Sequence, residues 1–191
     1  MTLIDNLEKI NKSNKKLIFI HTPKCGGTYV SSILEYLKIK NNGHNQATRY
    51  ENGITFTVIR DPINRFESLL NYRLDETTPR NDWPIHLRYA YKNKNITLNE
   101  IVSKMTNKEI LGFSPYKTLT YWTKNVDIII TLEALPVMLT YFGYTYDLTL
   151  FNPTNVSNKT RGKLNKKHID RIKNLYIDDV VLYNKITKTN L

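Results

Sequence analysis

The chain has 191 residues, 40% of them hydrophobic, and a formal net charge of +11. That length suits a single domain over residues 1–191 with a sizeable core, and the lone cysteine, Cys25, excludes an internal disulfide framework. No apolar run is long enough for a signal segment or a membrane anchor, so we expect a cytoplasmic protein. The positive charge favours anionic partners such as nucleotides, acidic glycans, nucleic acid or anionic membranes.

The first elements alternate between strand and helix. Residues 1–15 are polar and charged and are expected to form a flexible N-terminus. Lys16–His21 is a short apolar run that predicts a buried strand, and Thr28–Leu37 has the apolar spacing of a helix. Asn41–Asn45 is predicted to be a loop, and the β-branched and aromatic run Ile54–Ile59 a second strand.

A helix is predicted to start at Asp61 and Pro62, because Asp61 can cap free N–H groups and proline suits the first helical position. Residues 74–96 read as irregular. Thr97 and Glu100 have the spacing of a capping box, which predicts a short helix ending near Met105.

The remainder continues the alternation. Residues 107–124 suggest turns and a short helix, Val126–Thr131 a third strand, and Glu133–Phe142 a helix. Phe151–Lys163 is rich in Asn, Pro and Gly and predicts a loop. A long final helix is indicated by apolar residues at helical spacing: Ile169, Ile172, Tyr176, Val180, Tyr183 and Ile186. This alternation predicts an α/β fold with a central, mostly parallel sheet flanked by helices on both faces.

The loop between the first strand and the first helix carries chemistry. It reads HTPKCGGT, and a helix N-terminus of this kind binds anions through its free N–H groups. Gly26 and Gly27 let the backbone approach a ligand, Lys24 adds a positive charge, and Thr28 adds a hydroxyl. The ATP-binding loop G-x-x-x-x-G-K-[ST] has its lysine after the last glycine, whereas Lys24 precedes both glycines.

Two motifs together resemble the sulfotransferases that use 3'-phosphoadenosine 5'-phosphosulfate. FIHTPKCGGTYV resembles their 5'-phosphosulfate loop, in particular that of the carbohydrate branch, which includes heparan sulfate 2-O-sulfotransferase-like enzymes. FTVIRDPINRFESLLNYR resembles their 3'-phosphate motif, which puts Arg60 and Ser68 on the 3'-phosphate. Weaker matches follow in order at Val126–Leu135, Asn155–Lys163 and Leu175–Tyr183.

The resemblance implies a P-loop-like three-layer fold and an enzyme that transfers a sulfuryl group to an acceptor hydroxyl. In this branch of the family the acceptor is a carbohydrate. The implied donor is 3'-phosphoadenosine 5'-phosphosulfate, the product is 3',5'-diphosphoadenosine, and no metal is expected. The implied nucleotide-binding residues are Pro23, Lys24, Cys25, Gly26, Gly27, Thr28, Tyr29, Arg60, Ser68, Asn155, Ser157, Lys159 and Arg161.

Two residues are expected to be catalytic. Lys24 would stabilise the leaving oxygen, and His44, in a Gly-His pair between the two donor motifs, matches the branch's base. His21 is expected to shape the loop, and Cys25 to be a small loop residue rather than a nucleophile. His86 is a second residue that could reach the acceptor.

The sequence is also compatible with two other functions. A kinase-like phosphotransferase on a related fold is one alternative, although the ATP-type loop is absent. A nucleic-acid-binding protein that uses the basic stretch Lys159–Lys173 is another, although no recognition motif supports it and no nucleic-acid partner is expected. Arg65, Arg80, Trp83, Arg88 and Tyr91 have no firm assignment.

Overall fold

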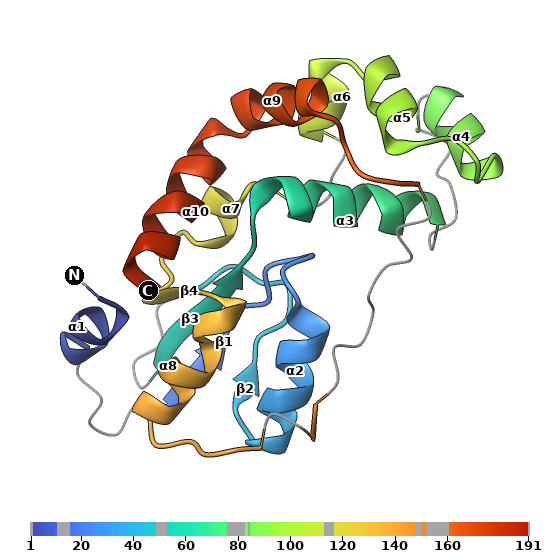
Figure 1. Cartoon of the computed structure of the whole chain (residues 1–191). Helices are drawn as coiled ribbons and strands as arrows, with labels where there is room; N and C mark the ends of the chain where they lie inside the picture. The colour runs from blue at the N-terminus through green and yellow to red at the C-terminus, as the bar shows by residue number, and fades with distance from the viewer. Residues whose placement is uncertain are drawn as a thin grey trace. The chain divides into compact units, whose positions relative to one another are not determined.

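The structure is a computed structural model of the chain (Figure 1). It describes residues 2–10, 16–48, 53–75, 83, 85–112, 117–147, 150–151 and 161–190. The chain forms two compact units. The first unit comprises Met1–Arg60, Lys117–Asn155 and Asp178–Leu191, and the second comprises Asp61–Tyr116 and Val156–Ile177. The expectation of a single domain over residues 1–191 stays a prediction.

The first unit contains a parallel sheet in the order β2-β1-β3-β4. Its strands are β1 (Lys16–Phe19), β2 (Lys40–Asn41), β3 (Gly53–Ile59) and β4 (Ile128–Thr131). This sheet with its flanking helices confirms the predicted α/β class. Phe19 pairs with Phe56, and Ile59 pairs with Thr131. The carboxyl ends of β1, β3 and β4 therefore lie along one edge of the sheet, where ligands of such sheets bind.

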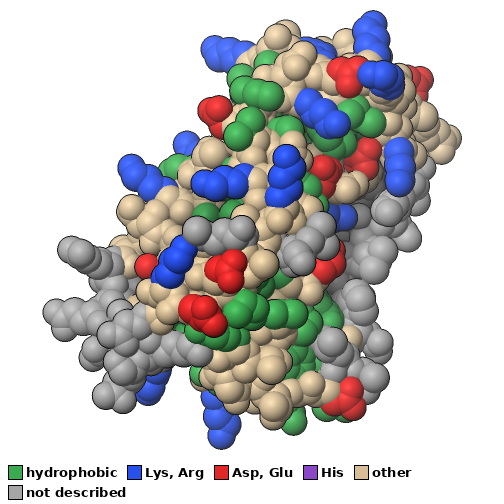
Figure 2. All heavy atoms as spheres, turned by 60° about the vertical axis from the view of Figure 1, so that its left-hand side comes forward, with side chains coloured by type: hydrophobic (Ala, Val, Ile, Leu, Met, Phe, Trp, Pro, Cys, Tyr) green, Lys and Arg blue, Asp and Glu red, His purple; other side chains and the backbone are tan. Residues whose placement is uncertain are grey.

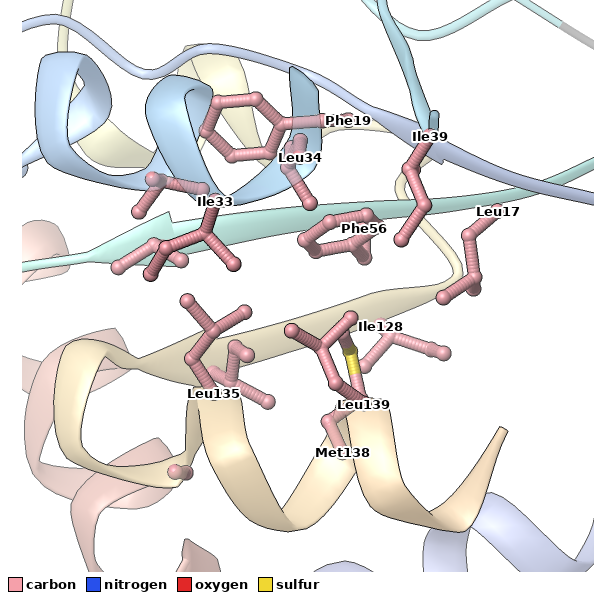
Figure 3. Packing of buried hydrophobic residues seen from close by; sticks show 14 of the residues in the cluster. Leu17, Phe19, Ile33, Leu34, Ile39, Phe56, Ile128, Leu135, Met138 and Leu139 are labelled. Carbon is pink, nitrogen blue, oxygen red and sulfur yellow. The ribbon is translucent and has the colours of Figure 1, made fainter. Parts of the chain in front are cut away.

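Helices cover both faces of this sheet. On one face α2 (Gly27–Tyr36) and α8 (Leu135–Tyr141) pack against Phe19, Phe56 and their neighbours (Figures 1 and 3). On the other face α7 (Leu119–Trp122) and α10 (Ile177–Asn190) bring side chains to Ile59 and Cys25. Each fully buried Phe or Leu stabilises the fold by roughly 1.5–3 kcal/mol, so these two layers of contacts hold the sheet in place.

The N-terminus differs from the expected flexible segment. Residues Leu3–Glu8 form helix α1, which begins with a capping box between Thr2 and Asp5. Leu3 and Leu7 are buried in the same core cluster as α8. Leu3 and Leu7 are four residues apart and therefore lie on one face of this short helix. Burying that face stabilises the helix although most of its other residues are polar.

The second unit is helical in its described residues. It contains α3 (Pro62–Asp75), α4 (Ile85–Lys92), α5 (Leu98–Lys104), α6 (Asn107–Gly112) and α9 (Lys166–Leu175). These helices surround their own apolar cluster, which includes Phe66, Leu70 and Ile172. The predicted capping box is confirmed, since Glu100 N donates to Thr97 Oγ1 and the Glu100 carboxylate accepts from Thr97 N.

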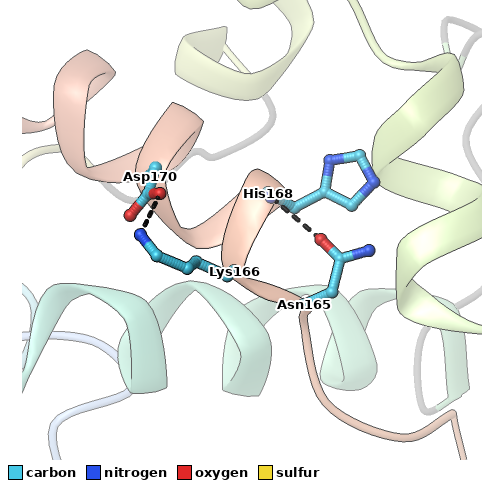
Figure 4. A network of polar contacts seen from close by, with 4 residues as sticks. All are labelled: Asn165, Lys166, His168 and Asp170. Carbon is cyan, nitrogen blue, oxygen red and sulfur yellow. Dashed lines mark hydrogen bonds and ion pairs between the residues drawn. The ribbon is translucent and has the colours of Figure 1, made fainter.

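Arg171 and the start of α9 provide polar contacts within the second unit. Arg171 donates to the carbonyls of Val102 and Met105 and to Oδ1 of Asn107, which links α9 to the α5–α6 connection. At the start of α9, Asn165 Oδ1 accepts from the backbone N–H of His168 (Figure 4). The neighbouring pair Lys166–Asp170 is well exposed and adds little stability.

Three element predictions were wrong in detail. Residues 40–41 pair with β1 as the short edge strand β2, although two polar residues give no strand pattern. The segment predicted as irregular contains α4, whose buried Leu87 and Ala90 are too few to show a clear period. The predicted long final helix is broken at Tyr176, so that α9 ends in the second unit and α10 belongs, apart from Ile177, to the first.

Among the described residues, no helix is both long and apolar enough to span a membrane. Figure 2 shows one face of the molecule, on which Lys and Arg side chains are spread singly among polar and acidic groups. Among the described residues on this face, the positive charge is therefore dispersed rather than gathered into one continuous patch.

Candidate functional site

The loop after β1 has the backbone geometry of an anion-binding turn. Lys24 has φ +62° and Gly26 has φ +82°, so two positions on either side of Cys25 are left-handed. Such alternation turns successive N–H groups toward one point, and helix α2 then begins at Gly27 with its own free N–H groups. A left-handed lysine costs about 1 kcal/mol or more, a strain typical of functional loops.

Contacts with neighbouring strands hold this loop in place. The buried hydroxyls of Thr22 and Thr57 lie 2.8 Å apart, and Thr57 Oγ1 donates to the carbonyl of Ile20. The side chain of Leu132, which follows β4, lies against Gly26. The loop is therefore held by contacts from the ends of three neighbouring strands, β1, β3 and β4.

The loop's side chains divide between core and surface. Pro23 and Cys25 are buried, and Cys25 packs in the cluster that contains Ile59 and Leu119, in keeping with its interpretation as a small packing residue. Tyr29 is half-buried against the main core cluster. Lys24 is half-buried and Thr28 is exposed, and both lie near the start of helix α2.

Arg60 lies at the same edge of the sheet as this loop. It follows β3 directly and is exposed. Because Phe56 pairs with Phe19 and Ile20 N donates to the Phe56 carbonyl, both chains leave the sheet side by side. Lys24 and Arg60 therefore lie at the same end of two adjacent parallel strands, as the sequence predicts.

The rings of two histidines lie close together beside the loop, tilted by 38° to one another. The ring centroids of His21 and His44 lie 4.1 Å apart, and His44 Nδ1 lies 2.8 Å from the carbonyl oxygen of His21. A carbonyl only accepts, so Nδ1 of His44 is the donor. His21 N in turn donates to the carbonyl of Gly43, which fixes the His44 turn against the end of β1.

His21 is held in the neutral form. Burial and, to a lesser extent, the nearby His44 lower its pKa to about 4. The ring of His21 also occupies the space where a side chain at Gly27 would lie. Gly27 is thus required by a neighbour within the protein, a contact that the sequence pattern does not reveal.

Helix α7 adds aromatic residues that sequence reasoning missed. The ring of Trp122 lies 6.3 Å from that of His44, and Tyr121 is exposed next to it. Trp122 is buried, and its indole N–H finds no acceptor among the described residues. No motif in residues 107–124 gives a signal for this cluster, because its members meet only through the sheet topology.

The remaining predicted nucleotide contacts fall in the second unit or outside the described residues. Ser68 lies on α3 and is half-buried. Asp61 caps the same helix, since its Oδ1 accepts from Asn64 N at 2.9 Å, and Arg65 is buried. Asn155, Ser157 and Lys159, as well as Arg80, lie outside the residues that the structure describes.

Arg161 has a different role from the predicted one. It is only 2% exposed, and its guanidinium donates to the carbonyls of Ala90, Asn93 and Ile96. These bonds use the nitrogens that a nucleotide phosphate would need. The sequence pattern of a basic loop does not distinguish such a buried structural arginine from an exposed ligand-binding one.

The other singled-out side chains also lie in the second unit. Trp83 and Tyr91 form an edge contact, with Lys94 over the Tyr91 ring, while Arg88 is exposed. His168 is buried, and burial lowers its pKa. Among the residues described, no group of three or more His, Cys, Asp or Glu side chains could hold a metal ion.

Comparisons with protein-family models, curated proteins and solved structures found no match to this chain.

Proposed function

We propose that this protein is a sulfotransferase that moves the sulfuryl group of 3'-phosphoadenosine 5'-phosphosulfate to an acceptor hydroxyl of a carbohydrate. The observation that carries the proposal is the anion loop at the first unit's sheet edge. Its left-handed residues Lys24 and Gly26 lead into α2, and Arg60 follows the adjacent strand. The residues of both resembling motifs that lie in this unit thus share one edge.

Each donor group has a partner in this proposal. The N–H groups of Cys25 to Thr28 and the hydroxyl of Thr28 bind the 5'-phosphate, since a helix N-terminus favours negative charge. The guanidinium of Arg60 pairs with the 3'-phosphate through two parallel hydrogen bonds. Ser68 adds a hydroxyl to the 3'-phosphate, an assignment that rests on the motif R-D-P-x-x-R-x-x-S.

The reaction is an in-line displacement at sulfur. The acceptor oxygen forms a bond to sulfur while the bond between sulfur and the 5'-phosphate oxygen breaks, and the acceptor proton passes to Nε2 of His44. Lys24 stabilises the negative charge that develops on the leaving phosphate oxygen. The products are the sulfated acceptor and 3',5'-diphosphoadenosine, with the proton on His44.

His44 suits the role of base because Nδ1 donates to the His21 carbonyl, which leaves the lone pair of the neutral ring on Nε2. An imidazole is also the natural base near neutral pH. A phosphotransferase could use a similar anion loop, but the lysine position differs from that of the ATP-binding loop and no G-x-x-x-x-G-K-[ST] motif occurs in the chain.

The test is a thermal-shift measurement with 3',5'-diphosphoadenosine, with ATP and adenosine 5'-phosphate as competing ligands. We expect selective stabilisation by the diphosphate, which is lost in Arg60→Ala and weakened in Lys24→Ala. A matched control is Lys16→Ala, which removes an exposed charge at the start of β1, the end of the strand opposite the loop. Equal stabilisation by ATP, or none by any nucleotide, would overturn the donor assignment.

A further inference from the structure

His21 contacts three parts of the candidate site at once. Its ring lies on the bare Cα of Gly27, the first residue of α2. The same ring lies 4.1 Å from the ring of His44. Its backbone carbonyl binds Nδ1 of His44, and its backbone N–H binds the Gly43 carbonyl. One residue therefore connects the start of the anion-binding helix to the imidazole that follows Gly43.

This arrangement defines the tautomer of His44. A neutral imidazole in water carries its hydrogen mainly on Nε2. Here a carbonyl oxygen faces Nδ1 at 2.8 Å, and a carbonyl can only accept. The hydrogen of neutral His44 is therefore on Nδ1, and the protein reverses the preference that the free side chain has.

The ring positions depend on one another. Phe19 stacks on His21 at 5.7 Å and 22°, so the core orients the first imidazole. His21 and Trp122 then both lie near the second imidazole. His44 is exposed, and these two rings and the His21 carbonyl are among the groups that contact it.

We propose that His21 is a positioning residue for His44: its ring, seated on Gly27, holds the His44 imidazole against the carbonyl with the lone pair on Nε2. The consequence is a link between the anion-binding loop, which contains Gly27, and the His44 imidazole. Any change that moves the His21 ring away from Gly27 also moves the neighbour that fixes His44. The inference rests on the proposed function only where it treats Nε2 of His44 as the base.

The neutral state of His21 supports this role. Burial, together with the nearby His44, holds its pKa at about 4, so near neutral pH the ring adds no positive charge next to His44. A charged neighbour at this distance would oppose the protonation that a base must undergo. Glycine at position 27 is the condition for this arrangement, because any side chain there would displace the ring.

The test is a long-range proton–nitrogen correlation experiment on the ¹⁵N-labelled protein at about pH 8, well above the ordinary pKa of histidine. It separates protonated from bare ring nitrogens. The chain has four histidines, and His44→Gln assigns the signals of interest. The variants are His21→Ala, which removes the ring, Gly27→Ala, which displaces it, and His21→Phe, which keeps a planar ring. His86→Ala in the second unit is the control.

In the wild type and in His21→Phe we expect His44 to carry its hydrogen on Nδ1. In His21→Ala and Gly27→Ala the signals should shift toward the Nε2–H tautomer, and in His86→Ala they should stay unchanged. The proposal is overturned if His44 has the Nε2–H tautomer in the wild type, if both ring-disturbing variants leave it unchanged, or if His21→Phe shifts it as much as His21→Ala. The measurement needs no turnover, so failure of 3',5'-diphosphoadenosine to bind would refute the proposed function and leave this result standing.

Discussion

The Cα of Gly27 supports the ring of His21, and a Cβ at that position would collide with Nε2 of the ring. Gly27→Ala should therefore destabilise the protein by about 1–3 kcal/mol, as other overpacked sites do. In the His21→Ala background the collision is absent, so the same change should cost much less. Urea unfolding of the two single variants and the double variant measures this coupling.

The control for that cycle is Gly112→Ala at the end of α6, where a Cβ would meet nothing within 4 Å. There alanine should be neutral or stabilise by about 0.4–1 kcal/mol, because it restricts the unfolded chain. Equal costs for Gly27→Ala with and without the His21 ring would show that the ring does not set the requirement for glycine.

The lowered pKa of His21 predicts an acid sensitivity of folding. The unfolded side chain has a pKa near 6.5 and the folded one a pKa of about 4, so the unfolded state binds the proton first. The contribution of neutral His21 to the free energy of unfolding is complete above pH 6.5 and is lost as the pH falls toward 4. Its total is roughly 3 kcal/mol. His21→Phe should flatten the stability profile between pH 6.5 and 5, measured by urea unfolding at each pH. Parallel profiles for wild type and variant would exclude a neutral, buried His21.

Arg161 tests the structural role against the predicted nucleotide role. Its guanidinium satisfies the carbonyls of Ala90, Asn93 and Ile96 in a buried setting. Arg161→Ala should cost at least about 3 kcal/mol, since charge-assisted bonds are lost and buried acceptors stay unpaired. Arg161→Lys should recover little, because an ammonium cannot reproduce the planar fork.

The measurement for Arg161 is chemical unfolding, with the exposed Arg88→Ala as a control expected within about 0.5 kcal/mol of wild type. Wild-type stability of Arg161→Ala together with lost binding of 3',5'-diphosphoadenosine would restore the nucleotide role that the sequence suggested.

At the scale of elements, α1 provides the clearest prediction. Leu7 is 1% exposed in the main core, whereas Ile4 on the same helix is 38% exposed. Leu7→Ala should destabilise the protein by roughly 2–5 kcal/mol, because it leaves a cavity in packed surroundings. Ile4→Ala should change stability by less than about 1 kcal/mol. Thermal and urea unfolding compare the two, and equal, small effects would mean that α1 does not dock on the core.

Elements with a strong local signal were predictable. The three apolar strands and the capping box at Thr97 and Glu100 carry their pattern in neighbouring residues, and the structure has them. β2 and α4 were missed because their stability comes from pairing and packing with distant segments. The break at Tyr176 was hidden because the apolar period continues from α9 into α10.

The candidate site shows the same limit. A glycine loop after one strand and an arginine after the next could be predicted to share an edge, because parallel strands end together. The close contact of the His21 and His44 rings and the approach of Trp122 involve residues far apart in sequence. The burial of Arg161 could not be predicted, because a basic residue in a loop has no local mark of burial.

At the scale of the whole molecule, the positive charge is unequally divided. The residues of the second unit include 15 Lys and Arg against 8 Asp and Glu, while those of the first include 13 against 9. The second unit therefore carries the larger excess, while the anion loop and Arg60 belong to the first. General attraction of anions and specific binding of a nucleotide are thus separable by mutation.

The triple variant Lys163→Gln, Lys167→Gln, Lys173→Gln removes exposed charges from the second unit. Its affinity for 3',5'-diphosphoadenosine, measured by calorimetry at physiological salt, should fall by less than about threefold, because salt screens exposed charges that do not contact the ligand. Arg60→Ala should reduce the same affinity by about tenfold or more, since it removes a charge-assisted pair. Binding of single-stranded DNA should show the opposite order, falling steeply with salt and with the triple variant but little with Arg60→Ala. Tight DNA binding that survives added salt, combined with no response of the diphosphate affinity to Arg60→Ala, would favour a nucleic-acid-binding protein over a sulfotransferase.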